Sequence, residues 1–281
     1  MDFANQLARP LKQAIAAEIV RLFNDPSKGE APIRPRPDGL FGPRSVSWRV
    51  HGDVVSMMVG GTTALMLQML HPPVLAGVWD HSRFRDDLNG RLRRTARFIA
   101  LTTYGGREEA EAAIAKVRAI HGHVRGTLPD GAPYEANDPA LLAWVHLTEA
   151  WSFLAGYVRY VEPRLRMVEQ DRYFAEIAEV GRRLGADPVP LTRRAAERQM
   201  RETRPLLRYD ARTREVARLL LTKPAPTPAS APLQALTRQA AVDLLPGWAR
   251  RMHGLEALLL SLPLIRATTF GASRTLRWAF R

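Results

Sequence analysis

Apolar residues recur along most of the chain at intervals of three and four positions, and apolar–polar alternation with a period of two is almost missing. The first spacing places side chains on one face of an α-helix, whereas the second is typical of a half-buried strand. The breaks between helical segments are short and rich in Gly and Pro. The pattern therefore predicts an all-α protein, built as a single large helical domain over residues 1–281.

The most apolar segment is Ser47–Leu70, which carries apolar residues on nearly all sides. A helix of that kind is typically central, and this one should stop at His71-Pro72-Pro73. A short loop through His81 and Phe84 should follow, and Asn89 is the expected N-cap of the next helix, which begins at Gly90. The remaining helices are predicted over residues 3–23, 90–104, 108–125, 140–160, 171–184, 192–203, 209–221, 233–245 and 248–262. Residues 1–43 should hold an N-terminal helix and a Pro-rich loop, residues 223–232 an exposed connector, and residues 266–281 a basic tail.

The chain contains no cysteine. Disulfides, zinc–thiolate sites, iron–sulfur clusters and Cys nucleophiles are thereby excluded, and a metal must be held by His, carboxylate or Tyr. Gly-rich phosphate loops, the GxSxG elbow and the HExxH arrangement are also missing from the sequence. The common nucleotide, hydrolase and zinc-protease classes therefore have no support.

The formal net charge of +13 comes mainly from scattered arginines rather than from a dense basic block. We expect a solvated basic surface and no nucleic acid partner, with peripheral contact to an anionic membrane left open. The N-terminus lacks a signal-peptide pattern. The longest apolar stretch, Leu255–Ile265, contains Glu256 and Pro263 and is about half the ~20 residues that a membrane span needs. A cytoplasmic location without a transmembrane helix is the resulting expectation, and the oligomeric state stays open.

His121 lies within the predicted apolar face of the 108–125 helix, whose other members are Ala113, Ile114, Val117, Ile120 and Val124. Residues two positions apart on a helix do not face the same way, so His123 points elsewhere. From spacing alone, a lone histidine on an apolar face is more often a core residue than a ligand.

The preceding helix carries Arg91, Arg94 and Thr95. Arg91 and Thr95 are i, i+4 neighbours and would together present donors to an anionic group. A solvated Arg face is the simpler alternative.

Glu149 falls on the apolar face of the 140–160 helix, where a carboxylate needs a partner. It would either accept a hydrogen bond from a metal-bound histidine or pair with an arginine. His146, offset from that face, is a second candidate for a metal ligand.

Several short sequence motifs occur in the same order and at similar spacing as in the family of the MpaB-type oxygenases and the latex-clearing rubber oxygenases, which this chain therefore resembles. They are Gly60-Gly61 to His71-Pro72, His81–Phe84, Arg91–Thr95 with Tyr104-Gly105, Val117–His121 with Val124–Gly126, Asn137–Pro139 with Trp144–His146, and Leu244–Trp248.

The resemblance implies a helical body that holds haem b between core helices, with His121 as the axial iron ligand and Arg91, Arg94, Thr95 and Glu149 close to the haem. Neutral imidazole is a suitable haem ligand. The expected function is a haem-dependent oxygenase that acts with O2 on an apolar substrate, prenyl or otherwise unsaturated, bound in a Met- and Leu-rich pocket drawn from Val54–Leu70. Arg91 and Thr95 would act near the reacting groups.

This chain differs from the rubber oxygenases at Arg94, because the rubber oxygenases have a Lys at the position just before the Thr that corresponds to Thr95. Guanidinium keeps its charge and is a poor metal ligand, so cleavage of polyisoprene is not implied. Two alternatives remain from the sequence: a non-catalytic haem-binding protein that docks on a membrane or partner, and a helical interaction protein without cofactor.

Overall fold

The structure, a computed structural model, describes residues 30–225, 227–255 and 262–279. The helix predicted over Phe3–Phe23 lies outside these residues. The described α-helices are α2 (Val46–His51), α3 (Val54–Gln68), α4 (Pro72–His81), α5 (Leu88–Tyr104), α6 (Arg107–His121), α7 (Pro139–Tyr160), α8 (Met167–Leu184), α9 (Arg193–Thr203), α10 (Ala211–Thr222), α11 (Ala231–Leu244), α12 (Gly247–His253) and α13 (Leu262–Ala279). Two 3-10 turns are η2 (Arg204–Leu206) and η3 (Pro228–Ser230). The prediction of an all-α protein is confirmed.

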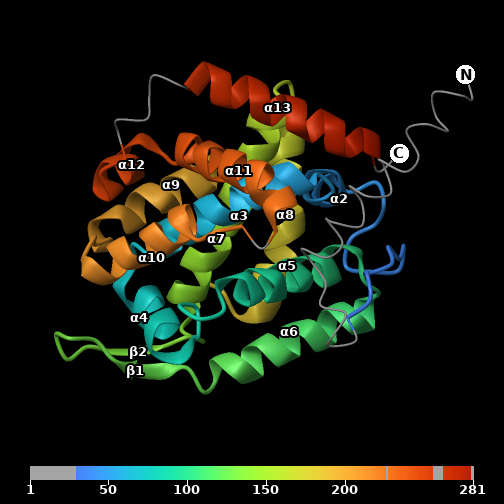
Figure 1. Ribbon diagram of the computed structural model, residues 1–281. Helices are drawn as coiled ribbons and strands as arrows, with labels where there is room; N and C mark the ends of the chain where they lie inside the picture. Colours follow the sequence, from blue (N-terminus) through green and yellow to red (C-terminus); the bar gives the residue numbers. More distant parts are fainter. Residues whose placement is uncertain (1–29, 226, 256–261, 280–281) are drawn as a thin grey trace, which may run out of the picture.

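The core is centred on α3 and α7, which pack against each other along their length. Figure 1 shows α3 in the middle of the molecule, with α11 and α13 on one side and α5 and α6 on the other. Gly60 permits the close approach, because a Cβ there would lie 2.9 Å from the Phe153 Cα and from the Ser152 carbonyl oxygen. The sequence correctly predicted a central helix in this region.

The predicted Ser47–Leu70 helix is in fact two helices, α2 and α3. The break occurs at Gly52-Asp53, because the Asp53 side chain accepts a hydrogen bond from the Ser56 backbone N–H at 2.9 Å and caps α3. His71-Pro72-Pro73 does end α3, but Pro72 also begins α4, where a loop was expected. The Asn89 cap was wrong as well, since Asp87 caps α5.

Helix α6 is shorter than predicted and ends at His121 rather than near residue 125. The chain continues into a small antiparallel hairpin of β1 (Arg125–Thr127) and β2 (Pro133–Glu135), the two strands among the described residues. The expected apolar face was wrong at Ile120, which is 54% exposed, whereas Ile114 is buried. On α6 the buried residues are therefore Ala110 and Ile114, and Val117 and His121 are half-buried.

The predicted exposed connector and basic tail both contain regular structure. Residues 223–232 include η3 and the start of α11, and Ser230 in that segment is buried, so the connector is not exposed throughout. The tail forms most of α13, where the Arg266 guanidinium pairs with the buried Asp243 carboxylate at 2.9 Å. Among the described helices none is long and apolar enough by itself to cross a membrane; α3 and α4 meet that test of length and composition only together, as a pair bent by 105°.

Candidate functional site

A cavity of about 460 Å³ lies among α3, α5, α7 and the segment from α10 to α11. This volume falls in the range of small-molecule and cofactor pockets, roughly 300–1,000 Å³. Its apolar lining includes Val54, Met57, Met58, Leu65, Leu92, Ala96, Ile99, Phe153 and Leu233. The α3 residues among them come from the Val54–Leu70 segment that the sequence suggested for an apolar pocket.

Glu149 is the acidic residue among those that line this cavity. Burial raises the pKa of its carboxyl to about 7, although a hydrogen bond with Gln68 and the charge of Arg91 both act to lower it. Near neutral pH the group is therefore poised between its protonated and ionised forms. A carboxyl in that state can accept or release a proton inside an otherwise apolar cavity.

His51 is a polar lining residue that the sequence did not single out. Its Nδ1 lies 2.8 Å from the Thr103 Oγ1 and its Nε2 lies 2.9 Å from the Tyr173 hydroxyl oxygen, so both ring nitrogens are hydrogen-bonded. Burial lowers the pKa of His51 to about 3, which keeps the ring neutral. These partners come from α5 and α8, and no local pattern around His51 indicates them.

His121 lies outside the cavity, at the last position of α6. Its Nδ1 is buried and has no hydrogen-bond partner among the described residues. Burial lowers the pKa of His121, and the nearby positive charge of Arg91 lowers it further. The ring is thus kept neutral, and its Nδ1 makes no hydrogen bond to another described residue.

Arg91 connects His121 with Glu149 electrostatically. Its guanidinium donates to the Ser82 Oγ at 3.0 Å. Burial lowers the pKa of Arg91, and the Glu149 carboxylate acts in the opposite direction. Arg91 on α5 therefore lies within electrostatic range of two other predicted site residues, the His121 ring on α6 and the Glu149 carboxyl on α7.

The other predicted residues of α5 are divided between the cavity and the surface. Thr95 lines the cavity, and its hydroxyl donates to the Arg91 carbonyl oxygen at 3.2 Å. Arg94 is exposed and lies 3.3 Å from the Asp87 carboxylate, outside the cavity. Arg94 therefore does not line the cavity, although its positive charge acts on Arg91 and helps to lower the pKa of that guanidinium.

His146, the second candidate ligand, is buried away from the cavity. Burial lowers its pKa to about 4, and its Nε2 has no partner among the described residues. The ring packs tightly against α8, since a Cβ on Gly181 would lie 2.9 Å from the His146 Cδ2. This close packing leaves no room beside that edge of the ring.

The donor set fits a haem better than a bare metal ion. In the described part of the chain no three His, Asp or Glu side chains are grouped to hold an ion. A haem needs one axial protein ligand in addition to its own four nitrogens, and a neutral imidazole meets that need. The unpaired Nδ1 of His121 has the chemistry of a metal ligand, and the partly buried guanidinium of Arg91 has that of a partner for an anionic group.

A comparison with models of protein families gives a match. Residues 48–278 match the family model described as "ER-bound oxygenase mpaB/B'/Rubber oxygenase, catalytic domain". No curated protein and no solved structure matches the chain. The match includes every residue discussed above as part of the site and confirms the resemblance that the sequence motifs indicated.

Proposed function

We propose, from the premise that the chain belongs to the catalytic-domain family of the MpaB-type and rubber oxygenases, that it is a haem b-dependent oxygenase acting on an apolar, unsaturated substrate. Membership of an oxygenase family supports oxygenase activity with a small-molecule substrate and O2 in general. The haem, the substrate class and the residue roles are the proposal.

The observation that carries the proposal is the apolar cavity of about 460 Å³ inside the matched domain. Met57, Met58 and Leu65 of α3 and Leu92 and Ile99 of α5 line a space suited to a hydrocarbon chain. Methionine side chains adapt to ligands of irregular shape. A prenyl or other unsaturated chain fits this lining.

His121 would hold the haem iron, and the Arg91 guanidinium would pair with a haem propionate. The bound haem would supply the activation of O2. His146 is the less suited ligand, because α8 packs against its ring.

The chain's own polar groups would prepare the cavity for the reaction. Glu149, with a carboxyl pKa near 7, would hold or release one proton at its carboxyl oxygen. Neutral His51, fixed by Thr103 and Tyr173, adds no charge to the cavity wall and so preserves its apolar character. Thr95 would contribute a hydroxyl at the α5 side of the cavity.

The test is oxygen uptake by the haem-reconstituted protein with squalene, using its saturated counterpart squalane as a matched control. Both substrates are offered with and without ascorbate as an electron donor. The proposal predicts uptake with squalene and none above background with squalane. A haem-loaded protein that consumes no O2 with any unsaturated hydrocarbon would favour the non-catalytic haem-binding alternative.

A pair of variants tests whether the cavity is the substrate site. Ala100 lines the cavity, whereas Ala115 lies exposed on α6. Ala100→Phe fills the cavity and should abolish most of the substrate-dependent uptake, while Ala115→Phe should leave it unchanged. Equal activity in both variants would place the substrate elsewhere.

A further inference from the structure

A second hollow lies on the surface between the end of α9 with η2 and helix α12. We call it the Arg–Trp cleft. It has a volume of about 550 Å³ and is lined by Arg201, Arg204, Pro205, Trp248, Arg251 and Met252. It shares no lining residue with the apolar cavity, and the inference drawn from it does not depend on the proposed function.

The three arginines of this cleft have no ion-pair partner among the described residues. The acidic residues of α9 are engaged with other arginines, because Glu197 pairs with Arg193 at 2.9 Å and Glu202 with Arg198 at 4.0 Å. Helix α12 contains no acidic residue at all. The cleft therefore has a positive charge that no described carboxylate balances.

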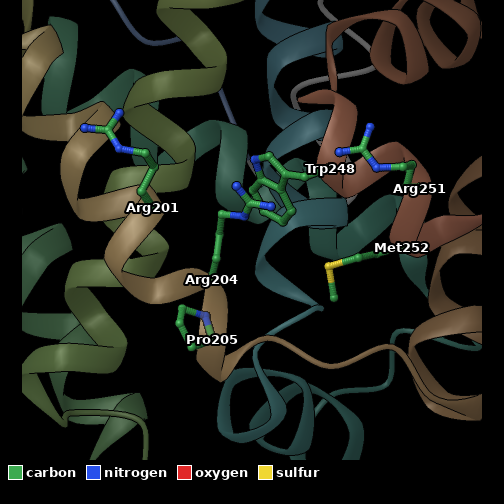
Figure 2. A pocket seen from close by; sticks show the side chains of 6 residues that line it. All are labelled: Arg201, Arg204, Pro205, Trp248, Arg251 and Met252. Atoms are coloured by element: carbon green, nitrogen blue, oxygen red, sulfur yellow. The ribbon is translucent and has the colours of Figure 1, made fainter.

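An aromatic ring forms the middle of the cleft. Figure 2 shows the Arg204 guanidinium against the Trp248 ring, with Arg201 on one side and Arg251 on the other. The Arg204 Cζ lies 5.1 Å from the ring centroid, within the range of a cation–π contact. Stacking restricts the guanidinium while leaving its N–H groups free to donate, which reduces the entropy lost when a ligand binds.

We propose that the Arg–Trp cleft binds the phosphate group of a phosphate ester, with the apolar remainder of the ligand against Trp248 and Met252. Guanidinium groups donate two parallel hydrogen bonds to phosphate oxygens, and the cleft is lined by Arg201 of α9, Arg204 of η2 and Arg251 of α12. The thioether of Met252 and the Trp248 ring give the lining an apolar part beside the charges.

Two sources carry this chemistry, a phospholipid headgroup and a soluble phosphate ester. Leu206 lies two residues after Arg204 and is 59% exposed, so an apolar side chain stands near the charged rim. Cationic and apolar side chains together are typical of surfaces that bind anionic lipids. The experiment therefore includes one arm for each source.

In the lipid arm, the full chain is co-sedimented with phosphatidylcholine vesicles that contain phosphatidic acid and with vesicles of phosphatidylcholine alone. In the soluble arm, glycerol 3-phosphate is titrated while tryptophan fluorescence is followed, with Trp248→Phe identifying the ring that responds. The variant is Arg201→Ala/Arg204→Ala/Arg251→Ala. The charge-matched control is Arg164→Ala/Arg182→Ala/Arg218→Ala, three exposed arginines outside the cleft and without ion pairs among the described residues.

We expect the cleft variant to bind at least about tenfold more weakly in one arm, since each charged hydrogen bond contributes on that order, and the control to bind like the unmodified chain. Binding in the soluble arm would identify a free phosphate ester, and binding only to phosphatidic acid vesicles a lipid headgroup. Equal losses in the two triple variants would show diffuse charge rather than a site and overturn the proposal. Failure of the unmodified chain to bind in both arms would also overturn it.

Discussion

Two neutral histidines in this protein, His51 and His121, differ in what their ring nitrogens contact. Both have a pKa lowered mainly by burial. His51 is hydrogen-bonded through both nitrogens, to Thr103 and Tyr173, whereas the buried Nδ1 of His121 has no partner among the described residues. Neutrality alone therefore does not identify a ligand; a histidine must also have a nitrogen that the protein does not use.

The largest expected effect is on stability when His51 is removed. His51→Phe keeps a ring of similar size but leaves the buried hydroxyls of Thr103 and Tyr173 without their partner. Each unsatisfied hydroxyl costs about 2 kcal/mol, so the fold should be destabilised by about 4 kcal/mol. Urea unfolding of the haem-free protein measures the change.

His121→Phe is the matched control for that experiment. Because no hydrogen bond to Nδ1 is lost, its effect on the haem-free protein should stay within about 1 kcal/mol. Similar losses in the two variants would break the distinction between a structural and an available histidine.

The next effect concerns Glu149 and has a defined direction with pH. Its folded pKa of about 7 lies above the ordinary value of 4.5, so the folded state binds the proton more tightly than the unfolded state. The stability that this group contributes is fully present below about pH 4 and is lost as the pH rises towards the folded pKa. The total loss is about 3 kcal/mol, because each unit of difference between the folded and unfolded pKa corresponds to about 1.4 kcal/mol.

Glu149→Gln removes this titration. The free energy of unfolding of the variant, relative to that of the unmodified protein, should therefore increase as the pH rises from about 5 to about 8. Other titrating groups cancel in the difference. A difference that stays flat over this range would contradict the poised carboxyl.

A smaller effect tests the close contact of α3 and α7 that forms one wall of the cavity. Gly60→Ala places a methyl group 2.9 Å from backbone atoms of α7 and should destabilise by about 1–3 kcal/mol through overpacking. Gly61→Ala, whose Cβ would have its nearest neighbour at 3.8 Å, should be neutral or stabilising. Equal melting temperatures for the two variants would argue against the packing described.

The smallest effect is expected at Arg94. Its exposed pair with Asp87 contributes about 0.5 kcal/mol or less, and the side chain does not line the cavity. Arg94→Ala should therefore leave both stability and haem content nearly unchanged, whereas Arg91→Ala should lower haem content. Loss of haem in Arg94→Ala would assign this side chain a role that its position in the structure does not indicate.

Helix type was predictable from the sequence, because periodicity and capping signals are local. Helix α7 begins at Pro139 and ends at Tyr160, within one residue of the prediction, since Asp138 and Pro139 form a strong start signal. The end of α6 was not predictable in the same way, because apolar spacing continues to Val124 beyond the last helical residue, His121. The hairpin that follows uses pairs such as Gly126 with Tyr134, which short-range patterns do not specify.

The candidate site was predictable only in part, for a related reason. Spacing alone left Arg91, His121 and Glu149 open to structural roles, and the family resemblance made them site candidates. The structure places the Arg91 guanidinium within electrostatic range of the His121 ring and of the Glu149 carboxyl. The contact of His51 with Tyr173 joins residues 122 positions apart. Tertiary packing decides which groups of this kind meet, and one sequence holds no direct record of it.

The most direct test of the central claim is the Soret absorbance of the protein after haem reconstitution, compared among single histidine variants. His121→Ala is set against His123→Ala, an exposed neighbour whose Nδ1 is hydrogen-bonded to the Ala119 carbonyl oxygen, and against His146→Ala. The account predicts a Soret band that is lost or shifted in His121→Ala alone. An unchanged band in His121→Ala, or no band in the unmodified protein, would contradict it.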